Sequence, residues 1–232
     1  MDKRFDRALL LYGEENLEKL KNSRILIVGL GGVGGYVIEG LVRSGISNFT
    51  IVDHDKVDIT NINRQIIALS STIGEYKCDL VEKRMKDINP LVNVEKYNIF
   101  YSEETKHIID LSQYDYVVDA IDSIKSKILL INEAYRTGTK IISSMGAGNK
   151  IEPSLIQISD LYKTDVDPIA KILRKELKPL GVKKLKVAYS KERPLVNKPV
   201  VASSSFIPSI MGLYIASEII KDITGIKGER GA

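Results

Sequence analysis

Cysteine, histidine and long hydrophobic runs are scarce in this chain of 232 residues. The single cysteine, Cys78, cannot close an intrachain disulfide, and with only two histidines it leaves too few ligands for a structural zinc site. The longest apolar run, residues 206–220, is too short to span a bilayer, and the charged N-terminus lacks the apolar core of a signal peptide. We therefore expect a cytoplasmic protein with no zinc and no transmembrane segment.

A large excess of one charge is also missing, because 34 Lys and Arg residues face 30 Asp and Glu residues, for a formal net charge of +4. With 44% hydrophobic and 28% charged residues, the composition is typical of a globular protein and excludes a wholly disordered chain. The basic residues are unevenly spread, however, and between Lys171 and Lys198 ten of them face only Glu176 and Glu192. This segment favours a polyanionic partner, although a solvated lysine-rich surface is an equally good interpretation of the segment alone.

Short apolar runs alternate with helical patterns along most of the chain. We predict strands at residues 24–28, 48–53, 93–100, 114–121, 140–144, 155–159 and 185–190. We predict helices at residues 33–44, 102–110, 123–137, 168–178 and 206–224. A further helix is predicted to begin at the capping-box spacing of Thr72 and Glu75 and to stop at Asn89-Pro90. Repeated strand–helix units of this length predict an α/β fold, a Rossmann-like and mostly parallel sheet with helices on both faces.

A glycine-rich turn separates the first predicted strand from the first predicted helix. Gly29, Gly31 and Gly34 fit the pattern G-x-G-x-x-G, in which backbone N–H groups and a helix N-terminus approach phosphate oxygens. Asp53 ends the second strand about twenty residues further on, where a carboxylate accepts hydrogen bonds from a ribose hydroxyl. These features predict a nucleotide site and, taken alone, also fit a dehydrogenase.

The polar segment after Asp53 favours ATP over a dinucleotide. Arg64 and Lys77 are cations suited to a triphosphate, whose negative charge builds up as pyrophosphate leaves. Asp122 follows a later strand, at the edge where open α/β sheets bind ligands, and its oxygens suit Mg²⁺. We therefore expect ATP and Mg²⁺ as cofactors.

Several motifs together resemble the ubiquitin-activating-enzyme-like family, the E1-like, ThiF-type adenylating enzymes that serve molybdopterin and thiamine synthesis in bacteria. The resemblance covers about residues 4 to 225 and rests on residues 4–7, 29–35, 53–55, 61–65, 77, 119–122 and 212–221. It implies one E1-like adenylation domain over residues 1–232. In that domain, residues 1–22 form an N-terminal helical segment, residues 23–150 a nucleotide-binding half, and residues 151–232 a substrate-facing half with the closing helix.

The same resemblance implies roles for individual residues. Asp53 would bind the ribose of ATP. Its phosphates would be held by Asn61, Arg64 and Lys77, and Asp122 would bind Mg²⁺ near the α-phosphate. Arg7 resembles the arginine that dimers of the family insert into the neighbouring subunit's site, so we expect a homodimer. The expected catalytic residues are Arg7, Arg64, Lys77 and Asp122. The remaining nucleotide contacts are expected from Gly29, Gly31, Gly32, Gly34, Asp55 and Gln65.

Two departures from the family pattern narrow the branch. The chain lacks the two CxxC pairs of the sulfur-carrier-activating members, and it lacks a thioester-forming cysteine in its later half, so Cys78 is interpreted as structural. Residues 143–150, residues 160–168 and the basic segment resemble instead the branch of tRNA threonylcarbamoyladenosine dehydratases. That resemblance implies adenylation of a tRNA-borne carboxylate, followed by cyclisation with loss of AMP.

A tRNA substrate also provides a role for the basic segment, since Lys and Arg that neutralise phosphates supply salt-dependent affinity. Spacings of three, four and seven residues put the basic residues of the predicted helix at 168–178 on one face. The expected tRNA contacts are Lys171, Arg174, Lys175, Lys178, Lys183 and Lys184, with Lys186 extending the patch.

Two other functions stay open on the sequence. The first is adenylation of the C-terminal carboxylate of a sulfur-carrier protein. The second is a non-catalytic, nucleotide-sensing regulator that binds nucleic acid, which the lack of a helix-turn-helix pattern disfavours. The resemblance also leaves open a bound monovalent cation and a sulfur-transfer protein as a partner.

Overall fold

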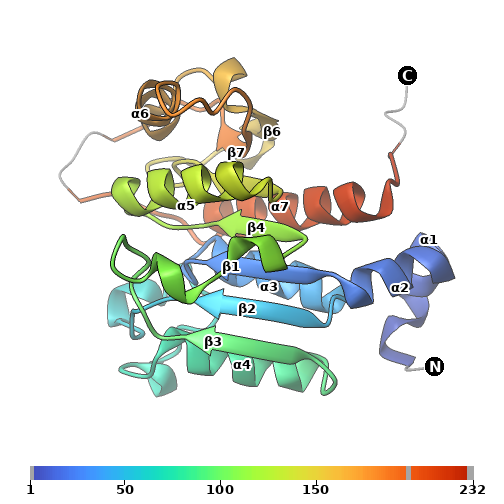
Figure 1. The fold of residues 1–232 in the computed structure, drawn as a ribbon. Helices are drawn as coiled ribbons and strands as arrows, with labels where there is room; N and C mark the ends of the chain where they lie inside the picture. Colours follow the sequence, from blue (N-terminus) through green and yellow to red (C-terminus); the bar gives the residue numbers. More distant parts are fainter. Residues whose placement is uncertain (1–2, 197–199, 229–232) are drawn as a thin grey trace.

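A seven-stranded sheet forms the centre of the molecule in the computed structural model, which describes residues 3–196 and 200–228 (Figure 1). The strand order is β3-β2-β1-β4-β5-β7-β6, and each pair is parallel except the antiparallel edge pair β6–β7. The strands are β1 (Arg24–Val28), β2 (Asn48–Val52), β3 (Asn93–Tyr97), β4 (Tyr116–Asp119), β5 (Ile141–Ser144), β6 (Ile156–Asp160) and β7 (Lys186–Ser190). The predicted α/β class is confirmed.

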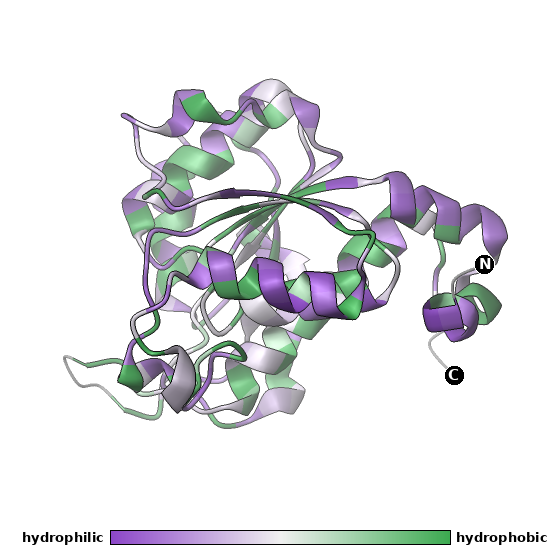
Figure 2. Cartoon of the chain, turned by 90° about the horizontal axis from the view of Figure 1, so that it is seen from below, coloured by the Kyte–Doolittle hydropathy of each residue, from purple (hydrophilic) through white to green (hydrophobic). Residues whose placement is uncertain are grey.

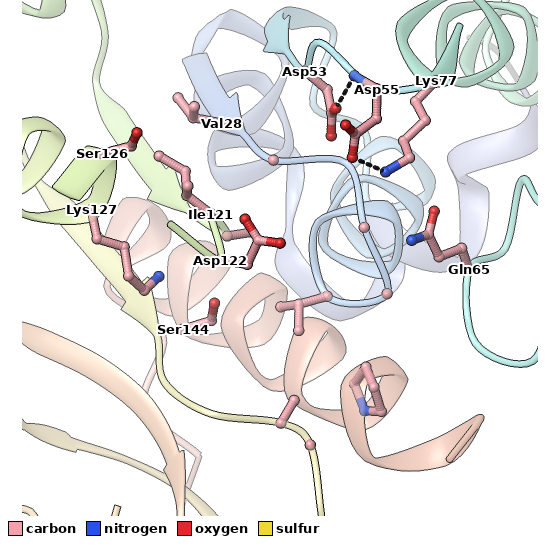
Figure 3. Close-up of a pocket in the computed structure, with 18 of the residues that line it drawn as sticks. Val28, Asp53, Asp55, Gln65, Lys77, Ile121, Asp122, Ser126, Lys127 and Ser144 are labelled. Atoms are coloured by element: carbon pink, nitrogen blue, oxygen red, sulfur yellow. Dashed lines mark hydrogen bonds and ion pairs between the residues drawn. The ribbon is translucent and has the colours of Figure 1, made fainter. Parts of the chain in front are cut away.

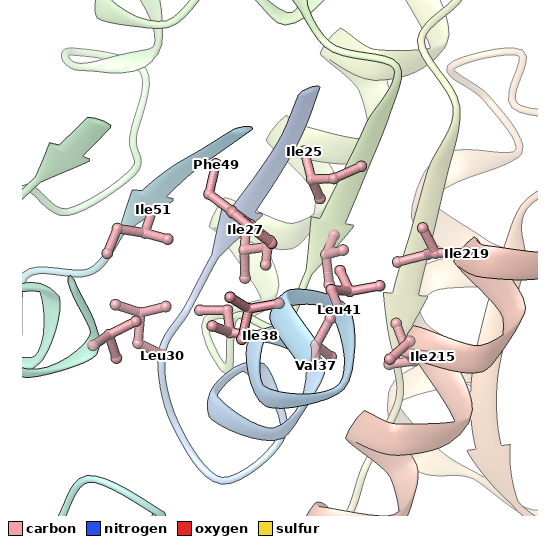
Figure 4. Close-up of a cluster of buried hydrophobic side chains, with 14 of the residues drawn as sticks. Ile25, Ile27, Leu30, Val37, Ile38, Leu41, Phe49, Ile51, Ile215 and Ile219 are labelled. Atoms are coloured by element: carbon pink, nitrogen blue, oxygen red, sulfur yellow. The ribbon is translucent and has the colours of Figure 1, made fainter. Parts of the chain in front are cut away.

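Helices cover both faces of this sheet, as Figure 2 shows along the sheet's edge. Side chains of α3 (Gly34–Arg43), α4 (Lys77–Ile88) and α7 (Phe206–Thr224) share one buried cluster with alternate residues of β1, including Ile25 and Ile27 (Figure 4). Leu26 and Val28 point the other way, into a cluster with α5 (Ile124–Thr137), and α6 (Pro168–Leu177) packs beyond it against β7. Burial on both faces explains why the central strands are continuous apolar runs rather than alternating ones.

Two short helices, α1 (Asp6–Tyr12) and α2 (Glu14–Asn22), precede β1 and lie near the amino ends of the strands (Figure 1). The closing helix α7 packs against α3 at very short range, because glycines stand at the contact. A Cβ on Gly40 would lie 2.7 Å from the Cβ of Ala216, and one on Gly212 would lie 2.5 Å from the carbonyl oxygen of Val33. Larger residues there would push α7 away from the helix that follows the glycine-rich turn.

The helix expected to open at Thr72 begins instead at Lys77, so that prediction is wrong in its start. The Thr72 hydroxyl is used in a preceding 3-10 turn, where it accepts a hydrogen bond from the N–H of Leu69. Gly74 then takes a positive φ of 89° and its N–H donates to the carbonyl of Val57. These bonds tie the chain back to the loop after β2 and place the first residue of α4, Lys77, beside that loop.

The helix expected at residues 102–110 is reduced to one 3-10 turn, Lys106–Ile108. The Thr105 hydroxyl accepts from the N–H of Ser102 and donates to the carbonyl of Phe100. Such local side-chain bonds offer the backbone an alternative to helical hydrogen bonds, which explains the shorter element. The other predicted helices agree with the structure to within one residue at each end, and the predicted strands to within three.

Candidate active site

A pocket of about 580 Å³ opens at the carboxyl ends of the central strands (Figure 3). This is the edge at which open α/β sheets bind ligands, and the volume lies within the usual range for a ligand site. The predicted site residues that line the pocket come from five separate segments of the chain: Gly29, Gly31, Gly32, Asp53, Asp55, Asn61, Arg64, Gln65, Lys77 and Asp122. The fold therefore brings these residues, which the sequence predicted to bind a nucleotide, together in one pocket.

Two sides of this pocket differ in their residues. The nucleotide wall is formed by Gly29, Gly31, Gly32, Val33, Asp53, His54, Asp55, Asn61, Arg64, Gln65 and Lys77. The acceptor wall is formed by residues 144–148 and Ile169. Asp122, Ser126 and Lys127 also line the pocket. In Figure 3, Asp122 lies between Ser144 and the nucleotide wall, whereas Ser126 and Lys127 lie on the side of Ser144.

The glycine-rich turn of the nucleotide wall allows no side chains at two positions. Gly29 has a φ of 95°, and a Cβ there would lie 2.5 Å from the carbonyl oxygen of Ala120. Gly34 does not line the pocket, and its missing Cβ would lie 1.9 Å from the carbonyl oxygen of Gly29. Gly34 thus acts on the turn from beneath, by letting α3 start directly under it.

The Asp53 carboxylate is buried at the end of β2 and is held by backbone donors. Its Oδ2 accepts from the N–H of Leu30 at 2.6 Å, and its Oδ1 accepts from the N–H of Asp55 at 2.8 Å. Each oxygen keeps a second lone pair, since an ionised carboxylate has about four acceptor sites. The carboxylate is therefore fixed in place and still able to accept from a ligand hydroxyl.

The two cations of the nucleotide wall are held differently. Lys77 is buried, and its Nζ lies 2.7 Å from Oδ2 of the half-exposed Asp55. The half-buried Arg64 donates from one nitrogen to the carbonyl of Thr60 at 2.9 Å and to Oδ1 of Asn63 at 3.0 Å, which leaves its other guanidinium donors for a ligand. A polyphosphate entering the pocket would compete with Asp55 for Lys77.

The amides of Asn61 and Gln65 are buried, but only one is satisfied by the protein. Oδ1 of Asn61 accepts from the N–H of Asp58 at 3.1 Å and closes a capping box around its own 3-10 turn. Oε1 of Gln65 has no hydrogen-bond partner among the described residues, although the side chain is 6% exposed. An unpaired buried acceptor costs about 1–3 kcal/mol, so this oxygen fits a donor on a ligand or on a ligand-bound water.

Sequence reasoning missed a fully buried ion pair at the base of the pocket. Nζ of Lys127 lies 3.0 Å from both carboxylate oxygens of Asp119, and the two side chains are 1% and 0% exposed. Asp119 also accepts from the Ser143 hydroxyl and, at 3.1 Å, from the N–H of Ile121. One carboxylate thus connects α5, β5 and the turn that carries Asp122.

A signal for this pair was present in the sequence. Lys127 precedes Leu130, Ile131 and Ala134 by three, four and seven residues, so it occupies the apolar stripe of α5. A lysine in such a stripe must be paired when the helix packs on a sheet.

Cys78 is buried beside the pocket and its Sγ lies 3.4 Å from the carbonyl oxygen of Asp53. Burial, together with the nearby Asp53 charge, raises the pKa of this thiol to about 12. A thiol with so high a pKa is a poor nucleophile at neutral pH, which agrees with a structural role.

The residues expected to contact tRNA do not all present their charges to solvent. The exposed members are Lys171, Lys175, Lys178, Lys183 and Lys184, which we name the basic patch. Arg174 is half-buried, and its guanidinium donates to the hydroxyl and the carbonyl of Thr164. The expectation for Lys186 is wrong, because its ammonium is half-buried and lies 2.8 Å from Glu218 and 2.7 Å from Asp222. Lys198 lies outside the described residues.

Arg7 lies on α1, exposed to solvent and at the opposite end of the strands from the pocket of its own chain (Figure 1). It therefore does not contribute to that pocket. Among the described residues, no helix is long and apolar enough to cross a membrane.

The mostly parallel sheet, with a pocket at the carboxyl ends of its central strands, is typical of α/β proteins that bind ligands at this edge. More specifically, the chain belongs to the ThiF family, whose model matches residues 5–231. It is 42% identical over 238 residues to the tRNA threonylcarbamoyladenosine dehydratase of Bacillus subtilis, covering 94% of each chain. It is 39% identical over 175 residues to the Escherichia coli protein of the same name, covering 75% of this chain and 65% of that one.

A solved structure leads to the same family. The Escherichia coli tRNA N6-threonylcarbamoyladenosine dehydratase in complex with ATP superimposes with a TM-score of 0.88 at 33% identity, over 96% of this chain and 94% of the other. The match covers nearly the whole chain, so the sheet is shared from one edge to the other.

Proposed function

We propose that this protein is an ATP-dependent tRNA threonylcarbamoyladenosine dehydratase, which adenylates and then cyclises the modified adenosine and releases pyrophosphate and AMP. The observation that carries the proposal is the two-sided pocket, in which a nucleotide wall faces a separate acceptor wall within one cavity. The near full-length similarity to the Bacillus subtilis enzyme supports the same substrate. Residues 23–150 supply the nucleotide wall and also residues 144–148 of the acceptor wall. To these, residues 151–232 add Ile169 and the basic patch on the substrate-facing side.

The chemistry needs both walls at once. The threonylcarbamoyl carboxylate attacks the α-phosphorus of ATP, a P–O bond forms, and pyrophosphate leaves from the same phosphorus. The mixed anhydride makes the carbonyl carbon electrophilic, so an atom of the same modified nucleoside attacks it and AMP leaves with the bonding electrons. The second step is intramolecular, which gives it a large proximity advantage and requires no protein nucleophile.

The nucleotide wall supplies most of the electrostatic stabilisation. Asp53 accepts from the ribose hydroxyls, while Arg64 and Lys77 stabilise the charge that develops on the departing pyrophosphate. Asn61 and Gln65 present amide groups beside the glycine-rich turn, and release of Lys77 from Asp55 accompanies phosphate binding.

Asp122 is the residue that would hold Mg²⁺. Its exposed carboxylate lines the pocket between the two walls, and the unpaired Oε1 of Gln65 is a further oxygen suited to a water of the ion. Oxygen ligands of this kind fit magnesium. When bound, the ion would neutralise part of the triphosphate charge.

A homodimer would complete the site. Arg7 is exposed on α1 together with Leu10 and Leu11, whose side chains are 87% and 72% exposed. Large apolar side chains exposed on a short helix favour burial against another surface. A second copy of the chain placed there would bring Arg7 to the partner's phosphates.

The function is tested by mass analysis of nucleosides from threonylcarbamoyladenosine-containing tRNA after incubation with the protein, ATP and Mg²⁺. We expect a product lighter by one water, formed only with ATP. Pyrophosphate exchange that depends on a small sulfur-carrier protein and not on modified tRNA would support the sulfur-carrier function instead.

A further inference from the structure

A second fully buried ion pair lies behind the acceptor wall. Nζ of Lys150 lies 3.0 Å from Oδ2 of Asp167, and the two side chains are 1% and 0% exposed. The same ammonium donates to the carbonyl oxygen of Gly146, in the acceptor wall itself. Both charges are withdrawn from water, so removing either one leaves the other without its counter-charge.

The Asp167 carboxylate also caps α6. Its Oδ1 accepts from the N–H groups of Ile169 and Ala170, each at 3.0 Å. Ile169 lines the pocket, and a Cβ on Gly146 would meet its Cδ1 at 3.6 Å and Oδ2 of Asp167 at 3.3 Å. One carboxylate therefore connects the start of α6, through Lys150, to the acceptor wall.

The same helix carries part of the basic patch. Leu173 and Leu177 are fully buried, whereas Lys171, Lys175 and Lys178 are exposed along the rest of α6 and just after it. A helix of ten residues is about 15 Å long and rigid. A phosphate held by these lysines is thus kept at a set distance from the pocket for as long as α6 stays attached to the acceptor wall.

We propose that Lys150 is a positioning residue that attaches α6 to the acceptor wall, so that a tRNA held by the basic patch presents its modified adenosine at the pocket. The inference rests on the proposed function, because it concerns the spacing of two contacts on one substrate. The Lys150 side chain is 1% exposed and does not line the pocket, so it acts through Gly146 and Asp167. Its loss misplaces the carboxylate relative to the α-phosphate, and a displacement of about 1 Å costs on the order of a hundred-fold in rate.

The experiment compares three variants of the full chain. Lys150→Met removes the ammonium and keeps much of the side chain's length. Because this variant leaves a buried carboxylate without its counter-charge, we add Lys150→Met/Asp167→Asn, in which asparagine keeps the helix cap and no lone charge is buried. Lys140→Met is the matched control, since Lys140 is an exposed lysine that precedes β5 at the sheet edge opposite the pocket.

The readouts are kcat for cyclised nucleoside, the affinity for tRNA at several salt concentrations, and the affinity for ATP. For the double variant we expect kcat to fall by about ten- to a hundred-fold. Its affinity for tRNA, the salt dependence of that affinity, and its affinity for ATP should equal those of the wild type and of the Lys140→Met control. This combination separates positioning from a general loss of structure, which would lower all of these quantities.

Two results would overturn the inference. One is a folded double variant with wild-type kcat, and the other is a folded double variant whose ATP affinity falls as far as its kcat. Wild-type protein that forms no product from modified tRNA would overturn the proposed function itself, and with it this inference, so the two failures are told apart by the wild-type reaction.

Discussion

The two walls of the pocket are held in place by different kinds of interaction. Gly29 in the nucleotide wall and Gly34 directly beneath it allow close backbone contacts, and backbone N–H groups hold the Asp53 carboxylate. The acceptor wall depends on two buried ion pairs. Lys150–Asp167 lies behind it, and the carboxylate of the Lys127–Asp119 pair accepts from Ser143, the residue before Ser144. Loss of one partner of a buried ion pair is strongly destabilising. An ion pair with a half-exposed partner, such as Lys77–Asp55 in the nucleotide wall, contributes little to the free energy of folding. Substitutions in the nucleotide wall should therefore lower turnover with little change in the free energy of unfolding. Substitutions in the acceptor wall should lower both.

The largest effect is expected at the Lys127–Asp119 pair, at the base of the pocket. Lys127→Met leaves the Asp119 carboxylate buried without its counter-charge, so the free energy of unfolding should fall by about 3–5 kcal/mol. Replacing both partners, in Asp119→Leu/Lys127→Met, should recover a large part of that loss because no lone charge is then buried. Denaturant unfolding of both variants measures this, and equal destabilisation of single and double variants would contradict the account.

The nucleotide wall should show the reverse behaviour. Arg64→Ala and Lys77→Ala each remove a cation from the developing pyrophosphate charge, and turnover should fall about 10²- to 10³-fold. Unfolding free energies should change little, because Arg64 makes exposed contacts and Asp55 stays half-solvated when Lys77 is removed. Pyrophosphate exchange with modified tRNA is the assay, and the exposed Lys56→Ala is the control. Near-normal exchange in both variants would remove the phosphate assignment.

Mixed dimers test whether the nucleotide wall is completed by a second chain. Arg7→Ala and Lys77→Ala proteins, each inactive alone, should regain activity after subunit exchange, since one of the two sites in a mixed dimer is then intact. The maximum recovery is about a quarter of wild-type activity if half of the dimers are mixed and each has one working site. Exchange verified by mass without any recovery would argue against the role of Arg7 in the partner's site.

Asp53 tests the nucleotide wall at its ribose end. Asp53→Ala removes a charged acceptor of hydroxyl hydrogen bonds, each of which contributes about 1.5–3 kcal/mol, so ATP affinity should fall at least roughly ten-fold. Calorimetry with ATP·Mg²⁺ measures this change, with NAD as the comparison ligand. Tight binding of NAD and none of ATP would return the site to the dehydrogenase interpretation.

The smallest effects are expected in the basic patch, on the exposed side of α6 and just after it. Replacing Lys171, Lys175 and Lys178 by Gln should weaken tRNA binding across sequences and lower the salt slope by about 0.9 per lost phosphate contact. Arg174→Gln should change the slope less, because its guanidinium already donates to Thr164. Titrations at several salt concentrations measure both, and an unchanged slope in the triple variant would identify the patch as an ordinary solvated surface.

Elements with a strong local signal were predicted closely. The strand at 24–28 and the helix at 206–224 agree with the structure at both ends, because an apolar run or a terminal glycine marks each boundary. The start of α4 was missed because the Thr72 hydroxyl and Gly74 bond to residues elsewhere in the loop. A capping pattern is a local signal, and it fails where a non-local contact takes the same groups.

By itself, the sequence determined the α/β class, the glycine-rich turn and the residues that the fold then gathered into the nucleotide wall. These follow from hydrophobic periodicity and from motifs whose members lie close together along the chain. Only the tertiary structure decided that Lys127 and Lys150 are buried partners of Asp119 and Asp167, that Arg174 and Lys186 are bound internally, and that Arg7 lies away from its own pocket. The physical reason is that the role of a charged side chain depends on whether folding leaves it in water or places an opposite charge beside it, and residue type alone does not encode that choice.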